Sequence, residues 1–203
     1  MMDAYMTEDV LAEAGAHLRR YLARFPHAQR HLRALQAQLE QTDHDLFSRS
    51  NMRGHITASV LMLDLPRRQV LLVHHRASGR WLQPGGHFEP GPAVEGSVLL
   101  ASGLREAREE AGAIHLRHLA WHPEGVVPLD IDSHPIAARP SKGEGDHTHH
   151  DFQYLVLADS AQATSAQEAE VHAARWAPVD ELAQLGSRLS RTRDKLKALR
   201  LVA

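Results

Sequence analysis

Three glutamates lie close together in the sequence, and their spacing could bring three carboxylates to one site. Glu109 and Glu110 follow Glu106 by three and four positions. On an α-helix, residues three and four apart project from one face. Carboxylates crowded in this way repel one another and raise at least one pKa, which is costly without a cation. Hard oxygen ligands favour Mg²⁺ or Mn²⁺, and Mg²⁺ commonly bridges a few carboxylates to substrate phosphates.

Neighbouring residues could hold these glutamates in place. Arg105 precedes Glu109 by four positions and could donate a charge-assisted hydrogen bond to it. Gly85 and Gly86 lie upstream; without side chains they let the backbone approach a ligand closely, and a carbonyl there could supply another oxygen to a metal. The alternative interpretation is a solvated acidic surface, which is what most glutamate-rich helix edges are.

An amphipathic helix is needed to position the carboxylates. Leu100, Leu104, Ala107 and Ala111 recur at spacings of four, three and four, which is typical of a buried helical stripe. The stripe predicts a helix from about Ser97 to Gly112, where the glycine would adopt a left-handed cap. The acids lie on the opposite edge of this helix and would face the site.

Two segments together resemble the signature of the Nudix hydrolase family. The signature reads G, five residues, E, seven residues and then R-E-U-x-E-E-x-G-U, where U is apolar. Residues 105–113 read REAREEAGA and match its second half completely, and residues 85–91 read GGHFEPG. The first half departs from the pattern, because Pro92 stands where the signature has its isolated acid and the loop is about five residues longer. Glu95 could replace that acid after the insertion, but we assign it no ligand role, because it does not stand at the signature's position.

This resemblance covers about residues 55–185 and implies both a fold and a chemistry. The implied fold class is α/β, a Nudix-like α/β/α sandwich with a mixed sheet. The implied reaction is attack of water on a phosphorus atom of a nucleoside diphosphate derivative or a related organic diphosphate, with Mg²⁺ (or Mn²⁺) as cofactor. Carried over by position, the metal ligands are Glu106, Glu109, Glu110 and Gly86, and the catalytic residues are Arg105, Glu106 and Glu109.

The rest of this region alternates between strands and helices. A β-branched apolar run from Ile56 to Leu63, a turn, and a second run from Gln69 to Val73 predict a hairpin. Residues 83–92 are interpreted as a loop. Further strands are predicted at 116–121, 129–137, 152–157 and 171–176, and further helices at 179–185 and 189–201. Strands around a central helix favour an α/β sandwich.

The N-terminal region has a different character. An apolar stripe between Val10 and Phe25, followed by Leu32, Leu35 and Leu39, predicts two helices over about residues 7–46. They contain no catalytic pattern and are expected to pack on the main domain or on another subunit, which is compatible with a homodimer. We therefore divide the chain into an N-terminal helical extension, residues 1–50, and a Nudix-like hydrolase domain, residues 51–203.

Composition narrows the function classes. The chain has 203 residues, a formal net charge of −2 and no cysteine. It lacks a global positive field for a nucleic acid, an apolar run long enough to span a membrane and any thiol for nucleophilic attack. These observations predict a cytoplasmic protein with no nucleic-acid or membrane partner, and the resemblance implies a small-molecule diphosphate as its substrate.

Several other polar residues are ambiguous. His147, His149 and His150, with Asp146 and Asp151, could bind a second metal or substrate phosphates, although an exposed polar loop from Ser141 to His150 is the simpler interpretation. Asp130, Asp132 and His134 alternate onto one strand face with the same ambiguity. Three residues before the glycine pair could contact a phosphate and a base or sugar ring of a substrate: Arg76, Arg80 and Trp81. Packing is the simpler role for Trp81. Near the C-terminus, a solvated helix face is the interpretation for Lys195, Lys197 and Arg200.

Two other functions compete with hydrolysis. A catalytically silent nucleotide-binding or regulatory module would explain the altered loop, but such a module would not need three carboxylates. An isomerase of isoprenoid diphosphates resembles the same fold, but it would usually call for a catalytic cysteine, and the chain has none. The signature handles the diphosphate only, so it does not identify the attached group.

Overall fold

The computed structural model describes residues 4–41, 44–112, 115–140, 143–162 and 171–202. Ala113, the last position of the REAREEAGA motif, and Ser141 lie outside the described residues. The centre of the fold is a mixed eight-stranded sheet around β1, His55–Asp64. β1 pairs in parallel with β7, His147–Leu157, and antiparallel with β2, Gln69–His75, and β4, Gly85–His87. The remaining strands extend the sheet: β3 (Arg80–Leu82), β5 (Arg117–His118), β6 (Asp130–Ile136) and β8 (Val171–Pro178).

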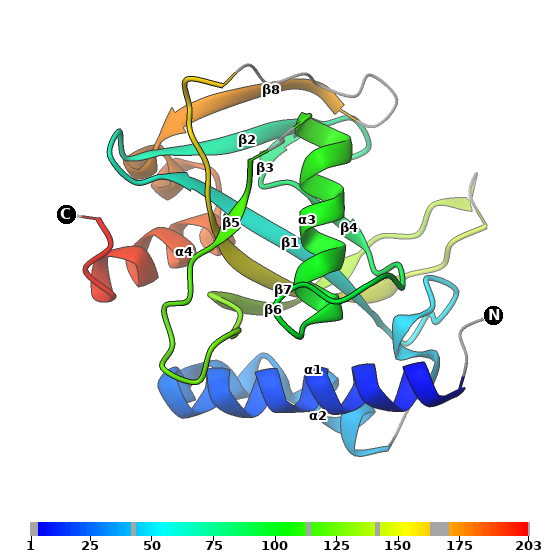
Figure 1. Cartoon of the computed structure of the whole chain (residues 1–203). Coiled ribbons are helices and arrows are strands. Elements are labelled where there is room, and N and C mark those ends of the chain that lie inside the picture. Colours follow the sequence, from blue (N-terminus) through cyan, green and yellow to red (C-terminus); the bar gives the residue numbers. More distant parts are fainter. Residues whose placement is uncertain (1–3, 42–43, 113–114, 141–142, 163–170, 203) are drawn as a thin grey trace.

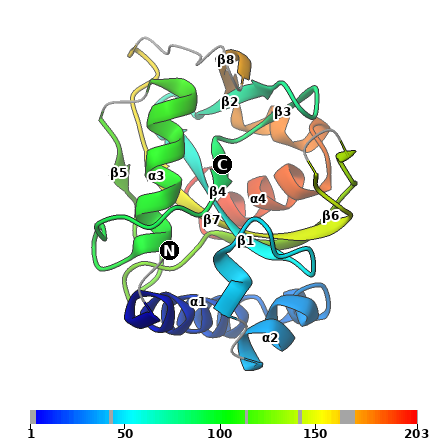
Figure 2. The same cartoon turned by 90° about the vertical axis from the view of Figure 1, so that its right-hand side faces the viewer.

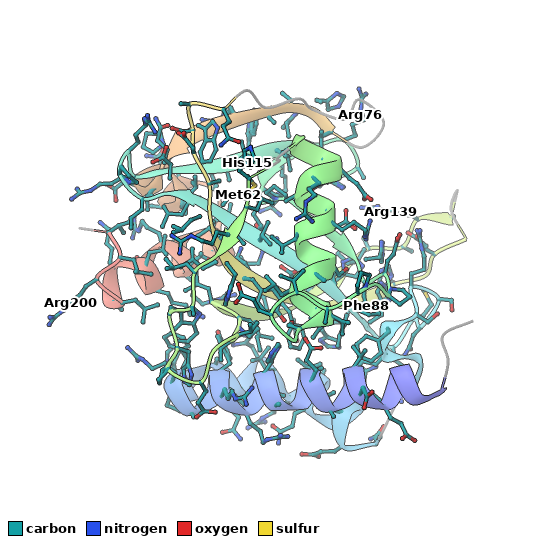
Figure 3. All side chains as sticks on the ribbon, viewed as in Figure 1. Met62, Arg76, Phe88, His115, Arg139 and Arg200 are labelled. Carbon is teal, nitrogen blue, oxygen red and sulfur yellow. The ribbon has the colours of Figure 1, made fainter. Side chains whose placement is uncertain are left out.

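Every residue of β1 is buried, because both faces of the sheet are covered. Alternate residues such as Val60 and Met62 pack in a core with α3, Val98–Ala111. Leu61 and Leu63 point the other way and pack with the 3₁₀ helix η4 and with α4; these are residues Val179–Gln184 and Ser187–Ala198. Figures 1 and 2 show α3 and α4 on opposite sides of the sheet, and Figure 3 shows Met62 beside α3. The predicted α/β/α sandwich with a mixed sheet and N-terminal helices is confirmed.

The N-terminal helices complete the core on the α3 side. α1 spans Ala4–Arg24 and α2 spans Arg33–Glu40, and both lie beneath the sheet in Figure 1. Two 3₁₀ helices, Pro26–Arg30 and His44–Phe47, connect them to each other and to β1. The buried apolar side chains of α1 and α2, among them Leu18 and Leu35, belong to the same core as α3. The helices therefore pack on the main domain as predicted, while the homodimer and the boundary at residue 50 stay predictions.

Several boundaries differ from those predicted. Residues 85–87, expected in a loop, form β4, because the two glycines let this segment pair closely with β1. β5 has only two residues, and residues 179–184 form a 3₁₀ helix. β7 begins at His147, five residues earlier than predicted, because its polar N-terminal half hid the strand pattern. No helix in the described part of the chain is long and apolar enough to cross a membrane.

A glutamate of α1 caps the N-terminus of α3. Glu13 accepts hydrogen bonds from the backbone N–H groups of Val98 (3.1 Å) and Leu99 (3.2 Å) and from the Ser97 hydroxyl (2.5 Å). The Ser97 hydroxyl in turn accepts from the Leu100 N–H at 2.9 Å. Three of the N–H groups that a helix start leaves without partners are thereby satisfied. A carboxylate at this end also interacts favourably with the helix dipole.

We expect Glu13→Ala to lower the free energy of unfolding by about 1–2 kcal/mol, because three donors at the start of α3 lose their acceptor. Denaturant unfolding followed by circular dichroism measures this change. The matched control is Glu8→Ala on the exposed side of the same helix, for which we expect less than about 0.5 kcal/mol. Equal effects of the two substitutions would contradict a capping role for Glu13.

A buried network of ion pairs ties α1, β6 and α4 together. Asp130 accepts hydrogen bonds from the Tyr21 hydroxyl (2.8 Å), from Arg191 Nη2 (2.7 Å) and from Lys195 Nζ. Arg191 Nη2 also donates to Asp132 at 2.6 Å. Burial lowers the pKa of Lys195, against the opposing effect of Asp130. The predicted solvated position of Lys195 is therefore wrong, because its ammonium group pairs with the buried carboxylate of Asp130.

Candidate functional site

The glutamates of α3 face β4, on the edge of the helix opposite its apolar stripe. Leu100, Leu104, Ala107 and Ala111 are buried in the core. On the opposite edge, Arg105 donates to Glu109 Oε2 (2.5 Å), to Glu106 Oε1 (2.6 Å) and to the His87 carbonyl (3.2 Å). The predicted contact between Arg105 and Glu109 is observed. Arg105 holds two carboxylates and one strand carbonyl through the planar fork of its guanidinium, a geometry that the compact ammonium of a lysine lacks.

Two glycines bring the backbone of β4 against these carboxylates. The Gly85 N–H donates to Glu110 Oε2 at 2.9 Å. A Cβ atom on Gly86 would lie 2.5 Å from Glu106 Oε1, so only glycine leaves room for that carboxylate. Glu106 and Glu110 are 6% and 1% exposed, and such buried acids need compensating charge. Glu109 is the exposed member of the three.

The donor chemistry beside β4 is that of oxygen ligands. Glu106, Glu109 and Glu110 offer carboxylate oxygens, which are the kind of donor that Mg²⁺ and Mn²⁺ prefer. The space that a Cβ of Gly86 would fill lies directly beside Glu106. Two of the acids are almost fully buried, and Arg105 already shows that this position accepts positive charge.

The five-residue insertion is absorbed by a tight turn away from the glutamates. Val94 and Ser97 exchange both backbone hydrogen bonds (3.0 and 2.9 Å), and Glu95 and Gly96 between them have positive φ angles of 50° and 78°. The Glu95 carboxylate pairs with His118 Nδ1 of β5 at 2.9 Å. Glu95 thus points toward β5 at the start of α3, while the acid pattern lies at the other end of the helix.

A further acid, which the signature does not include, lies beside Arg105. Glu89, which follows β4, lies 3.6 Å from Arg105 Nη1. Sequence reasoning gave Glu89 no role, although its place in the GGHFEPG segment was a signal. It is exposed and extends the row of acids around Arg105.

The predicted exposed loop from Ser141 to His150 is wrong from His147 onward, because His147–Asp151 belongs to β7. His147 and His149 lie on one face of β7, and His150 points to the other face, where it bonds to Ser133 (2.8 Å) and Gln38 (2.9 Å). Alternation along the strand therefore separates the histidines that the sequence placed together. Asp146, at the end of the β6–β7 hairpin, accepts from the Ala138 N–H at 2.8 Å.

His149 instead meets two histidines that sequence reasoning missed. Nitrogen atoms of His55, His87 and His149 all lie within 4.8 Å of one another. Burial lowers the pKa of His149 to about 2 and that of His87 to about 4. The pKa of His55 is also lowered by burial. All three rings are therefore neutral at physiological pH, which is the form that binds metals.

Asp151 lies in a group of buried polar side chains beside β4. It accepts from Ser59 (2.7 Å), Thr57 (3.1 Å) and Gln83 (3.3 Å), and Arg188 of α4 lies 3.6 Å away. These contacts account for Asp151 structurally. Asp130 and Asp132 are likewise occupied by the ion-pair network, although they do alternate onto one face of β6 with His134 as predicted. The Arg175 guanidinium stacks over Trp81 at 4.6 Å, which supports packing as the role of that tryptophan.

Comparisons with known proteins agree with this architecture. The family model described as NUDIX domain matches residues 53–199. A solved Ap4A hydrolase of C. elegans in a binary complex is 14% identical, with a TM-score of 0.52 over 71% of this chain and 96% of its own. A NUDIX-family hydrolase of Clostridium perfringens is 22% identical, with a TM-score of 0.51 over 73% of this chain and 99% of its own. No curated protein matches the chain.

Proposed function

Because the chain belongs to the Nudix family, we propose that it is a divalent-metal-dependent hydrolase that cleaves a diphosphate linkage in a nucleoside diphosphate derivative or a related organic diphosphate. The predicted family is confirmed; substrate and metal are proposals. The observation that carries the proposal is the arrangement of α3 against β4, where Arg105 joins Glu106 to Glu109 and the Gly85 N–H holds Glu110.

Each residue of this arrangement has a proposed task. Glu106, Glu109 and Glu110, with the Gly86 carbonyl, would hold Mg²⁺ or Mn²⁺. Such an ion, when bound, neutralises the diphosphate and lowers the pKa of the attacking water. Arg105 positions Glu106 and Glu109 through its two short hydrogen bonds. The proton acceptor is assigned to the three carboxylates as a group, because coupled acids share their titration.

The insertion in the loop gives little support to a silent binding module. Its residues fold into the turn at Val94–Ser97, and the adjoining helix keeps its N-cap at Ser97. The acidic end of α3 therefore retains its contacts with β4 despite the longer loop. We also propose a cytoplasmic location and a small-molecule substrate, on the basis of composition and of the absence of a membrane-crossing helix among the described residues.

The test is release of phosphate or nucleotide from a panel of nucleoside diphosphate derivatives, with and without Mg²⁺ or Mn²⁺. We expect turnover that requires the metal, and a loss of about 100-fold or more in kcat for Glu109→Gln. Glu109 suits this test because it is exposed, so the substitution should leave the fold intact. Glu124→Gln, at another exposed ion pair, is the control and should keep wild-type activity. Metal binding without turnover on a broad panel would favour the binding-module alternative.

A further inference from the structure

A cluster of histidines lies on the sheet next to the acidic helix. His87 of β4, His55 of β1 and His149 of β7 come from three neighbouring strands. His55 is directly opposite His149 in the parallel ladder, and His87 is opposite Thr57, two residues further along β1. Residues two apart on a strand share a face, so the three rings converge. Their centroids lie 4.7 to 5.3 Å apart.

His55 has a buried nitrogen with no hydrogen-bond partner in the described structure. The side chain is 1% exposed, and its Nδ1 lies 3.2 Å from the Asn51 carbonyl, which can only accept. The ring proton therefore belongs on Nδ1, and Nε2 keeps its lone pair. That Nε2 is buried and meets no donor among the described residues. A histidine that donates through one nitrogen to a backbone carbonyl and presents the other bare is the usual arrangement of a metal ligand.

The same reasoning fixes the ring of His149. His147 Nδ1 lies 2.8 Å from the Gly145 carbonyl and so carries the proton, which makes His147 Nε2 an acceptor. His149 Nε2 lies 3.1 Å from that atom and donates to it. The Nδ1 of His149 consequently keeps its lone pair. Hydrogen bonds to backbone carbonyls thus fix the tautomers of His55 and His147, and His55 and His149 each keep one unprotonated nitrogen.

We propose that His55, His87 and His149 bind one divalent transition metal ion, of the Zn²⁺, Co²⁺ or Ni²⁺ class. Imidazole nitrogens suit these ions, whereas Mg²⁺ prefers oxygen ligands. Tetrahedral ligands at about 2.0–2.1 Å from Zn²⁺ lie roughly 3.3 Å from one another. The histidine nitrogens lie within 4.8 Å of one another, and we expect their rings to turn and close to this separation around an ion. Three protein ligands leave a fourth position for water or an anion.

This site is distinct from the one formed by the glutamates, although both use β4. Gly85 and Gly86 contact the acids of α3, whereas the ring of the next residue, His87, packs against His55 and His149. The two sites differ in donor chemistry, since one offers carboxylate oxygens and the other neutral nitrogens. A chain with both sites would bind Mg²⁺ at the glutamates and Zn²⁺ at the histidines.

The experiment uses the full-length chain without a histidine tag, stripped of metal by a chelator and dialysed. Zn²⁺ is titrated in competition with a chromogenic chelator, and Co²⁺ binding is followed by visible absorption. We expect one tight site per chain, unaffected by excess Mg²⁺. His149→Ala should weaken Zn²⁺ binding by about 100-fold or more. His87→Gln is the second variant, in case the first does not fold by circular dichroism.

Two controls separate the sites. His31→Ala removes an exposed histidine that does not belong to the cluster, and it should leave the affinity for Zn²⁺ unchanged. Glu109→Gln should also bind Zn²⁺ normally, even if diphosphate hydrolysis is lost, so the two proposals can fail independently. Affinity for Zn²⁺ that is unchanged in both His149→Ala and His87→Gln, or that disappears in Glu109→Gln, would overturn the histidine site.

Discussion

Replacing Asp130 with asparagine is expected to lower the free energy of unfolding by about 3–5 kcal/mol, the usual cost of removing one partner from a buried ion pair. Asp130 is 2% exposed and faces both Lys195 and Arg191. Asparagine keeps the shape of the side chain but not its charge, so the Lys195 ammonium stays buried without compensation. The measurement is urea unfolding of both proteins at one pH.

Two further variants distinguish charge from packing. Asp159→Asn removes an exposed aspartate whose partner, Arg67, is also exposed, and should change stability by less than about 1 kcal/mol. Adding Lys195→Met to Asp130→Asn should recover much of the loss, because the stranded ammonium disappears. A loss for Asp130→Asn no larger than that for Asp159→Asn would show that the network contributes little.

Gly86→Ala is expected to lower kcat for metal-dependent diphosphate hydrolysis by about 100-fold while leaving stability nearly unchanged. The new methyl group would lie 2.5 Å from Glu106 Oε1. The end of a glutamate side chain can swing away at small cost in folding energy, but it then leaves the position that Arg105 and β4 impose on it. Displacements of about 1 Å in a catalytic group can cost about 100-fold in rate.

The control for this prediction lies in the same loop. A Cβ on Gly91 would meet no atom within 4 Å, so Gly91→Ala should retain wild-type kcat. Steady-state kinetics and thermal unfolding of both variants separate the two effects. A Gly86→Ala enzyme with normal kcat would mean that Glu106 need not occupy its observed position.

Local periodicity explains what the sequence could predict. The apolar spacing of α3 and the offset from Arg105 to Glu109 are both properties of a single helix, and both agree with the structure. The hairpin of β1 and β2 is equally local. The histidine site was missed because His55 and His149 meet only through a parallel pairing between distant strands. Nothing near His55 in the sequence indicates which strand will lie beside it.

The same limit applies to the contacts of the N-terminal helices. The apolar stripe from Val10 to Phe25 predicted a helix that packs on the main domain or on another subunit. It did not predict that Glu13 would cap α3 or that Tyr21 would donate a hydrogen bond to Asp130. Lys195 was interpreted as solvated because lysines on a terminal helix usually are. Its buried partner lies 65 positions away in the sequence.

The parallel pairing of β1 with β7 also has a consequence for synthesis of the chain. Leu63 pairs with Leu157, which is synthesised 94 positions later. The backbone of Leu63 therefore has no β7 partner until that residue has been made. At about 5–20 residues per second, the ribosome needs roughly 5–20 s to make that stretch. During this interval one edge of the apolar segment Val60–Leu63 is open to pairing with other chains. The nascent chain should therefore depend on chaperones more than a protein built from consecutive hairpins.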